Sequence, residues 1–284
     1  MSRRIVHANG VDLCVETFGD RADPAILLVH GTGNCMLLWA DDLCRRLAAG
    51  RRFVIRYDLR DAGRSTSYPP RRPGYALPDL VEDAAGLIDA LGIDRAHIVG
   101  MSLGGAIAQR LALDHPDRVA GLTLTASTPG IPGGESPDLP GVVDGVFADE
   151  PATPDWTDRA AVIDYLVEAE RPCAARSRPF DEAAMRETMA RVFDHTANME
   201  SSVTNMFMME AGEPWRSRLS EVSAPTLIAH GVEDPVFPYA HGVALADEIA
   251  DAALLPLERT GHEYFPAATW DVVVPAILQV GSTR

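Results

Sequence analysis

The sequence has 284 residues, of which 46% are hydrophobic, so the chain can bury a large core without disordered stretches. Its formal net charge of −16 argues against a nucleic-acid partner, because binding to a phosphate backbone needs a basic face. All 25 cationic residues are arginine, and the lack of lysine excludes Schiff-base chemistry and a P-loop lysine.

The sequence disfavours both a secreted and a membrane-bound protein. Residues 1–6 have a basic start but no apolar segment of the length that a secretory signal needs. No stretch approaches the roughly 20 apolar residues of a membrane span. The cysteines are scattered without a C-x-x-C pair, which suits reduced thiols: Cys14, Cys35, Cys44 and Cys173. We expect a cytoplasmic protein without a membrane partner.

The chain begins with two strand-like runs, 5–8 and 11–18, joined at Asn9-Gly10, a dipeptide that favours a tight hairpin turn. Short apolar runs then alternate with helical stretches such as 80–91, where apolar residues recur at helical spacing. These runs cover residues 25–30, 53–58, 96–100, 122–126, 226–230 and 252–257. The alternation predicts an α/β fold with a mostly parallel, eight-stranded sheet and helices on both faces.

The alternation is interrupted after residue 128. A Pro/Gly-rich passage, 129–134, leads into mainly helical sequence, and strands resume only at 226. Inserted at this place, the segment is expected to lie over the carboxyl ends of the strands as a helical cap. We therefore divide the chain into a core, 1–128 and 216–284, and a cap, 129–215.

The sharpest local signal is Gly100-Met101-Ser102-Leu103-Gly104, which lies between the strand 96–99 and a helical stretch from 105. Glycines two positions before and after a serine let strand and helix pass close to each other, so that the turn holds the hydroxyl above the sheet. A chance pattern in a glycine-rich loop is the alternative. The strand-turn-helix context favours Ser102 as a nucleophile.

A serine nucleophile needs a base. Five histidines follow the serine: His115, His195, His230, His241 and His262. Only His262 lies in a loop directly after a strand near the end of the chain. His115 sits at a helix end before a proline, His230 closes a strand and suits a structural role, and His195 and His241 are expected on helix surfaces, although His195 could also face a pocket.

The acid that orients the base is expected between nucleophile and base in the chain. Asp234 fits, because it follows the strand 226–230, and Glu233 is its alternative by adjacency. Pro235 restricts the backbone of Asp234, which favours it over Glu233. The oxyanion of acyl transfer would be bound by the backbone N–H of Leu103 and by that of Thr32, although His30-Gly31-Thr32-Gly33 could also be an ordinary turn.

Four further side chains are candidates for substrate binding, because methionine adapts to bulky ligands and aromatic rings stack on flat ones: Trp39, Met206, Phe207 and Phe237. Three of them, Trp39, Met206 and Phe207, could equally pack the core or fix the cap to it.

These elements together resemble the α/β-hydrolase fold over nearly the whole chain. The segments that carry the resemblance occur in the family's order: His30-Gly31, 56–65, the serine turn, Asp234 and Gly261-His262. Residues 56–66 and 89–100 look most like aclacinomycin methylesterase-like esterases and are also similar to enol-lactonases and cofactor-free haloperoxidase-like esterases. Many relatives have Arg-Gly where this chain has Arg60-Asp61, which leaves the shape of that loop open.

The resemblance implies a serine hydrolase that cleaves a carboxylic ester of a bulky, largely apolar small molecule, a methyl ester of a polyketide-type metabolite being one candidate. Epoxide hydrolases and haloalkane dehalogenases of this fold carry aspartate where this chain has Ser102. The alternatives are an enol-lactone or carbon–carbon bond hydrolase with the same triad, and a non-catalytic ligand receptor. We expect no metal site and no cofactor. The sequence does not address the oligomeric state.

Overall fold

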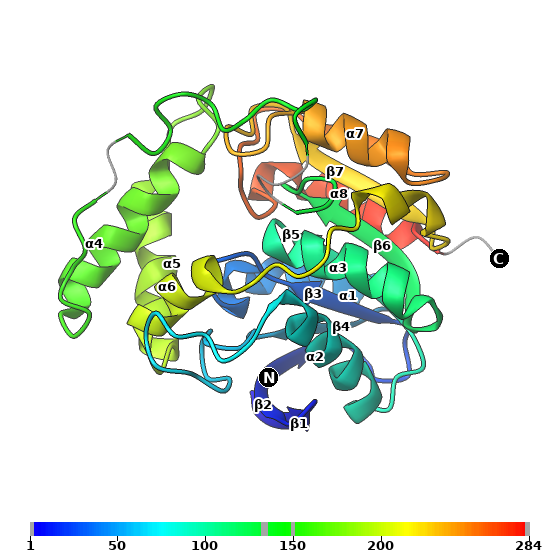
Figure 1. Ribbon diagram of the computed structural model, residues 1–284, viewed down its shortest axis with the longest axis horizontal. Helices are drawn as coiled ribbons and strands as arrows, with labels where there is room; N and C mark the ends of the chain where they lie inside the picture. Colours follow the sequence, from blue (N-terminus) through cyan, green and yellow to red (C-terminus); the bar gives the residue numbers. More distant parts are fainter. Residues whose placement is uncertain (1–2, 132–135, 149–150, 282–284) are drawn as a thin grey trace.

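The computed structural model describes residues 3–131, 136–148 and 151–281. Within these ranges one sheet of eight strands has the order β1-β2-β4-β3-β5-β6-β7-β8 (Figure 1). The first pairings, β1 with β2 and β2 with β4, are antiparallel and all others are parallel. The strands are β1 Arg4–Ala8, β2 Val11–Phe18, β3 Ala25–Val29, β4 Phe53–Tyr57, β5 Ala96–Met101, β6 Val119–Thr125, β7 Thr226–Gly231 and β8 Ala253–Leu257. The predicted fold class is confirmed.

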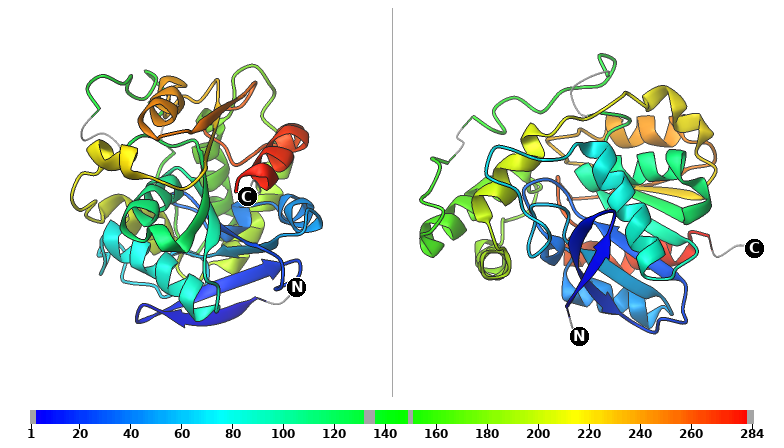
Figure 2. Two further views of the ribbon diagram at one scale, coloured as in Figure 1. Left: turned by 90° about the vertical axis from the view of Figure 1, so that its right-hand side faces the viewer. Right: turned by 60° about the horizontal axis from the view of Figure 1, so that its bottom comes forward.

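Helices cover both faces of the sheet, as predicted (Figure 2). One face carries α1 (Asp41–Ala49) and α8 (Trp270–Gln279), and their apolar side chains form one core cluster with the sheet. The other face carries α2 (Leu77–Ala90), α3 (Leu103–Asp114) and α7 (Ala240–Glu248). The 3₁₀ turns are Met36–Leu38, Pro116–Arg118, Arg171–Cys173, Arg216–Glu221 and Ala267–Thr269.

The central strands are buried along their whole length, which is why they appear as continuous apolar runs in the sequence. Arg56 in β4 places a charged side chain within such a run. Its guanidinium is buried, but it forms ion pairs with Glu16 and, at 2.6 Å, with Asp41, so the charge is not left unpaired.

Three helices lie between β6 and β7, beside the carboxyl ends of the parallel strands (Figure 1): α4 Arg159–Glu170, α5 Glu182–His195 and α6 Met199–Met208. Each begins after an N-cap side chain that accepts hydrogen bonds from its first turn, namely Asp158, Asp181 and Asn198. Of the proposed cap, residues 132–135 and 149–150 lie outside the described ranges, and with them half of the Pro/Gly-rich passage. We refer to residues 129–215 as the insert.

Both ends of the insert meet one side chain of α3. Gln109 is fully buried; its Nε2 donates to the carbonyl of Thr128 at 2.9 Å. Its Oε1 accepts from the N–H of Gly130 at 3.2 Å and from Nε1 of Trp215 at 3.1 Å. These bonds bring the two ends of the insert together at α3. In the described part of the chain, no helix is both long and apolar enough to cross a membrane.

Candidate active site

Ser102 lies at the turn between β5 and α3 with φ 54° and ψ −116°, in a region that residues other than glycine rarely adopt. The glycines on either side, Gly100 and Gly104, leave no room for a side chain. A Cβ on Gly100 would lie 2.2 Å from the carbonyl oxygen of Gly104, and a Cβ on Gly104 would lie 2.2 Å from that of Val29. The strained turn therefore depends on two positions where strand and helix backbones touch.

His262 and Asp234 are joined by a hydrogen bond. The two oxygens of Asp234 lie 3.0 and 3.2 Å from Nδ1 of His262. The backbone N–H groups of Val236 and Phe237 donate to Asp234 Oδ1 at 2.9 and 2.8 Å. Burial by itself would raise the pKa of the Asp234 carboxyl, but the charge and hydrogen bond of His262 and these N–H groups hold it below its ordinary value. The carboxylate is thus ionised and fixed in direction.

Glu233, the alternative acid, points elsewhere. Its carboxylate accepts hydrogen bonds from the backbone N–H and the hydroxyl of Ser177 in the insert. His230 is buried, and its Nε2 donates to the carbonyl of Phe237 at 2.8 Å. Burial lowers the pKa of this imidazole, which keeps it neutral. The geometry therefore favours Asp234 as the partner of His262 and a structural role for His230.

The loop after β3 lies against the serine. A Cβ on Gly31 would be 3.3 Å from Cβ of Ser102, and the N–H of Gly31 donates to the hydroxyl of Tyr264 at 2.7 Å. This bond ties the loop that contains Thr32 to the loop that contains His262. Leu103 is the first residue of α3, so its N–H has no partner within the helix and lies at the positive end of the helix dipole.

The four candidates for substrate binding separate into two pairs. The ring of Phe237 stands edge-on to His262 at 5.4 Å, and the ring of Phe207 is 73% exposed and reaches to 3.7 Å from a Cβ placed on Gly33. Trp39 and Met206 are buried in the core, at 0% and 4% exposure. Packing from distant segments explains the burial of Trp39, whose ring contacts Tyr264 and Phe265.

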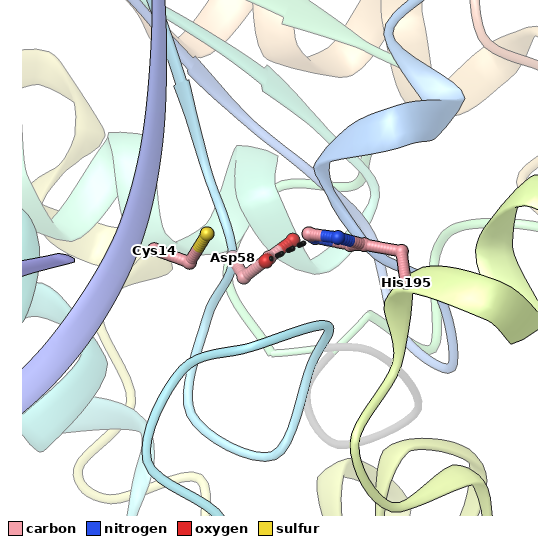
Figure 3. A group of neighbouring side chains, drawn as sticks. All are labelled: Cys14, Asp58 and His195. Carbon is pink, nitrogen blue, oxygen red and sulfur yellow. Dashed lines mark hydrogen bonds and ion pairs between the residues drawn. The ribbon is translucent and has the colours of Figure 1, made fainter. Parts of the chain in front are cut away.

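Two histidines expected on helix surfaces are buried. His241 bonds to the hydroxyl of Thr128 through Nδ1 and to the carbonyl of Pro140 through Nε2, both at 2.8 Å. His195, the last residue of α5, donates from Nε2 to Asp58 at 2.7 Å, directly after β4 (Figure 3). Burial opposes the charge of Asp58, but the bond to His195 and two backbone N–H groups hold the pKa of its carboxyl below the ordinary value.

Cys14, Asp58 and His195 together offer three metal-ligand atoms within 4.8 Å of one another (Figure 3). Burial, and then the charge of Asp58, raise the pKa of the Cys14 thiol to about 12, so that it is protonated. The oxygens of Asp58 already accept from the N–H groups of Met36 at 3.0 Å and Arg64 at 3.1 Å. The donor set is therefore satisfied by hydrogen bonds, and we interpret it as a contact between insert and core.

Arg60-Asp61, where many relatives have Arg-Gly, fits into the loop after β4. Asp61 has φ 66°, a left-handed conformation that aspartate tolerates better than most residues. Its carboxylate accepts from the N–H of Tyr68 at 2.6 Å and from Nδ2 of Asn205, in α6, at 2.9 Å. A glycine at this position would allow the turn but not the bond to the insert.

Sequence reasoning missed a carboxyl that lies near the proposed base. Glu170, at the end of α4, accepts from Nδ2 of Asn34 at 3.0 Å, two residues after Thr32. Burial raises the pKa of the Glu170 carboxyl, and the charge of His262 acts in the opposite direction. No motif marks either residue, because the contact joins segments more than 130 positions apart in the chain.

The strained serine turn, the His–Asp pair and the sheet order are those of an α/β hydrolase, and the chain belongs to this family: the α/β-hydrolase fold family matches residues 24–267. The resemblance inferred from the sequence is confirmed. The protein is therefore a hydrolase of the α/β-hydrolase fold.

Individual members of this family are similar to the chain over most of its length. The chain is 30% identical to rhodomycin D methylesterase DauP of Streptomyces sp. (strain C5), over 98% of its own length and 97% of that protein. It is 32% identical to 2-hydroxymuconate semialdehyde hydrolase of Pseudomonas sp. (strain CF600), over 84% and 80% of the two chains. A hydrolase structure from Pseudomonas aeruginosa PA01 is similar with a TM-score of 0.71, at 26% identity over 98% of each chain.

Proposed function

We propose that the protein is a serine esterase that cleaves a carboxylic ester of a bulky, largely apolar small molecule through an acyl-enzyme. The observation that carries the proposal is the hydrogen bond between His262 and Asp234 in a chain whose Ser102 occupies the strained turn between β5 and α3. The similarity to a methylesterase over nearly the whole chain supports the ester as the bond that is cleaved.

In this mechanism Ser102 Oγ attacks the ester carbonyl carbon while Nε2 of His262 takes its proton. Asp234 accepts from Nδ1–H, which leaves Nε2 as the acceptor, and then stabilises the imidazolium. The N–H groups of Leu103 and Thr32 bind the oxyanion, each contributing on the order of 3 kcal/mol to the transition state. The alcohol leaves with the proton of His262. Water, deprotonated by His262, then attacks the acyl-enzyme, and His262 returns this proton to Ser102 Oγ as the bond to the acid breaks.

The insert supplies the preference for an apolar substrate. Of the seven exposed large apolar side chains among the described residues, five lie in the insert: Val142, Val143, Phe147, Phe207 and Met208. Among them, Phe207 lies near the loop that contains Thr32, because its ring is 3.7 Å from a Cβ placed on Gly33. A methyl ester of a polyketide-type metabolite agrees with an apolar ring at this place and with the methylesterase relative.

The direct test is Ser102→Ala, with Ser223→Ala at an exposed position as the control. Hydrolysis of a chromogenic short-chain ester should fall at least about a thousandfold in Ser102→Ala, because removal of a triad nucleophile disables the whole triad. A fluorophosphonate probe should label wild type and Ser223→Ala but not Ser102→Ala. Undiminished activity in Ser102→Ala, or an unlabelled wild type, would refute the proposal, and the latter would favour a ligand receptor.

The similarity to 2-hydroxymuconate semialdehyde hydrolase favours one alternative, hydrolysis of a carbon–carbon bond next to a carbonyl by the same residues. Enol-lactones are a further class of substrate for this triad. Product analysis after incubation with methyl esters, enol-lactones and β-diketones separates these activities. Faster turnover of the last two classes than of any ester would replace the esterase assignment.

A further inference from the structure

A short segment of the insert, residues 173–178, contacts the loops that carry both the proposed acid and the proposed base. On the acid side its partner is Glu233, which directly precedes Asp234. The backbone N–H of Ser177 donates to Glu233 at 2.9 Å, and the hydroxyl of Ser177 donates to its second oxygen. These bonds hold the pKa of Glu233 below its ordinary value, so this carboxylate stays ionised. We call residues 173–178 the bracing segment.

On the base side the partner is Glu263, which directly follows His262. Its Oε2 accepts from the N–H of Gly261 at 3.0 Å and from the N–H of Ala175 at 3.3 Å. Its Oε1 forms an ion pair with Arg178. One carboxylate therefore bonds to its own loop and to the bracing segment at the same time.

The backbones of the two segments also touch. The N–H of His262 donates to the carbonyl of Cys173 at 2.8 Å. A Cβ on Gly261 would lie 2.2 Å from that same carbonyl oxygen, so only glycine fits at this position. The guanidinium of Arg178 donates to the carbonyl of Arg259 at 3.2 Å. The insert thus contacts the backbone of this loop at Arg259 and at His262 itself.

We propose that Glu233 and Glu263 are positioning residues: through them the bracing segment sets the place of Asp234 and His262 relative to Ser102. The proposal rests on the function proposed above. It assigns these two carboxylates no contact with substrate. Glu233 and Glu263 precede and follow the acid and base by one residue, so a shift of either loop moves a triad side chain. Misplacement of a reacting group by about 1 Å can cost 10²-fold in rate.

The ion pair is accessible enough to alter without leaving a buried charge. The side chains of Arg178 and Glu263 are 23% and 17% exposed, and both line an open crevice of about 680 Å³ between α5 and residues 258–270. The variants are Glu263→Gln, Glu263→Ala and Arg178→Gln. Glu258→Gln is the matched control, because it removes a carboxylate charge from an exposed position before the same loop.

The measurements are KM and kcat on a chromogenic ester, with kcat expressed per serine labelled by the fluorophosphonate probe, and the thermal unfolding midpoint. Glu263→Ala should lower kcat per labelled site 10- to 100-fold and leave KM within about twofold. Glu263→Gln should lose less, because its amide oxygen can still accept from the two N–H groups. Arg178→Gln and Glu263→Gln together should lower kcat by less than the product of the single effects. Glu258→Gln should match wild type.

A role in folding alone gives a different result: a lower unfolding midpoint and fewer labelled sites, with unchanged kcat at each site. Either this result or wild-type kcat in Glu263→Ala overturns the proposal while the esterase assignment stands. If wild type itself is not labelled, the proposed function fails first. Should Glu263→Ala not fold, Glu233→Ala removes both bonds to Ser177 at the acid side, and unchanged kcat per labelled site in that variant would also contradict the proposal.

Discussion

Two histidine–carboxylate pairs in this protein have nearly the same geometry and opposite surroundings. Nε2 of His195 lies 2.7 Å from Asp58, and the side chains are 1% and 0% exposed. Nε2 of His115 lies 2.8 Å from Glu82, with 29% and 53% exposure. Because distance and chemistry are matched, the two pairs isolate the effect of burial on the value of such a contact.

His195→Ala leaves the carboxylate of Asp58 without its main partner in a place that water does not reach. Removing one member of a buried pair typically costs about 3–5 kcal/mol, and the space left by the imidazole adds to this value. His115→Ala breaks an exposed pair, for which about 0–1 kcal/mol is typical. The predicted difference between the two variants is therefore about 3 kcal/mol in the free energy of unfolding.

The assay is equilibrium unfolding in urea, followed by the fluorescence of the four tryptophans. A third variant, Asp58→Asn in the His195→Ala background, should recover part of the lost stability, because a neutral amide costs less to bury than an unpaired carboxylate. The reasoning is refuted if His195→Ala and His115→Ala unfold within about 1 kcal/mol of each other, or if Asp58→Asn destabilises His195→Ala further.

Three other outcomes are expected. Gly104→Ala should abolish ester hydrolysis and lower the unfolding midpoint, because its Cβ would lie 2.2 Å from a carbonyl oxygen of β3; soluble, active Gly104→Ala would contradict the close packing. The pKa values of Asp58 and Asp234 are lower in the folded state than the ordinary 3.8, so the stabilisation by these two carboxylates is present above that pH and is lost as the pH falls through the folded-state values. Urea unfolding midpoints measured downward from pH 5 should therefore fall, and Asp58→Asn should make this fall less steep. Phe207 is exposed, so Phe207→Ala should raise KM for bulky esters without loss of stability. Met206 is buried, so Met206→Ala should lower the free energy of unfolding by about 2–5 kcal/mol and leave KM unchanged. The reverse pattern would show that Met206 binds substrate and that Phe207 stabilises the fold.

The triad residues that we propose from the sequence are those with a local signature. Ser102 is marked by glycines at two fixed positions, and the structure shows that both are places where backbones touch. His262 is marked by its loop after a strand. Asp234 needed a choice between neighbours, and the geometry favours it: its side chain bonds to His262 and to its own loop, while Glu233 bonds to the insert.

The features that sequence did not predict depend on partners far away in the chain. His195 lies at the end of a helix, where the sequence suggests solvent, but Asp58 lies 137 positions earlier and buries it. Trp39 suits a pocket by residue type, yet Tyr264 and Phe265 enclose it in the core. Glu263 carries no signal beyond its place next to His262. Residue type and spacing cannot report such contacts, because they form only when the insert packs on the core.

The order of the strands explains why these distant contacts matter for the proposed chemistry. Ser102 follows β5, whereas His262 follows β8, three strands away in the order β5-β6-β7-β8. Adjacent strands are about 4.8 Å apart, so the starting points of the two loops are separated by about 14 Å. The sheet fixes Ser102 through a strained turn at the strand itself, but it cannot by itself bring His262 across that distance. The loop after β8 must do so, and among its described contacts those with the insert are the ones that hold it from outside the core. Substitutions in the bracing segment are therefore expected to change the rate of the chemical step before they change the fold.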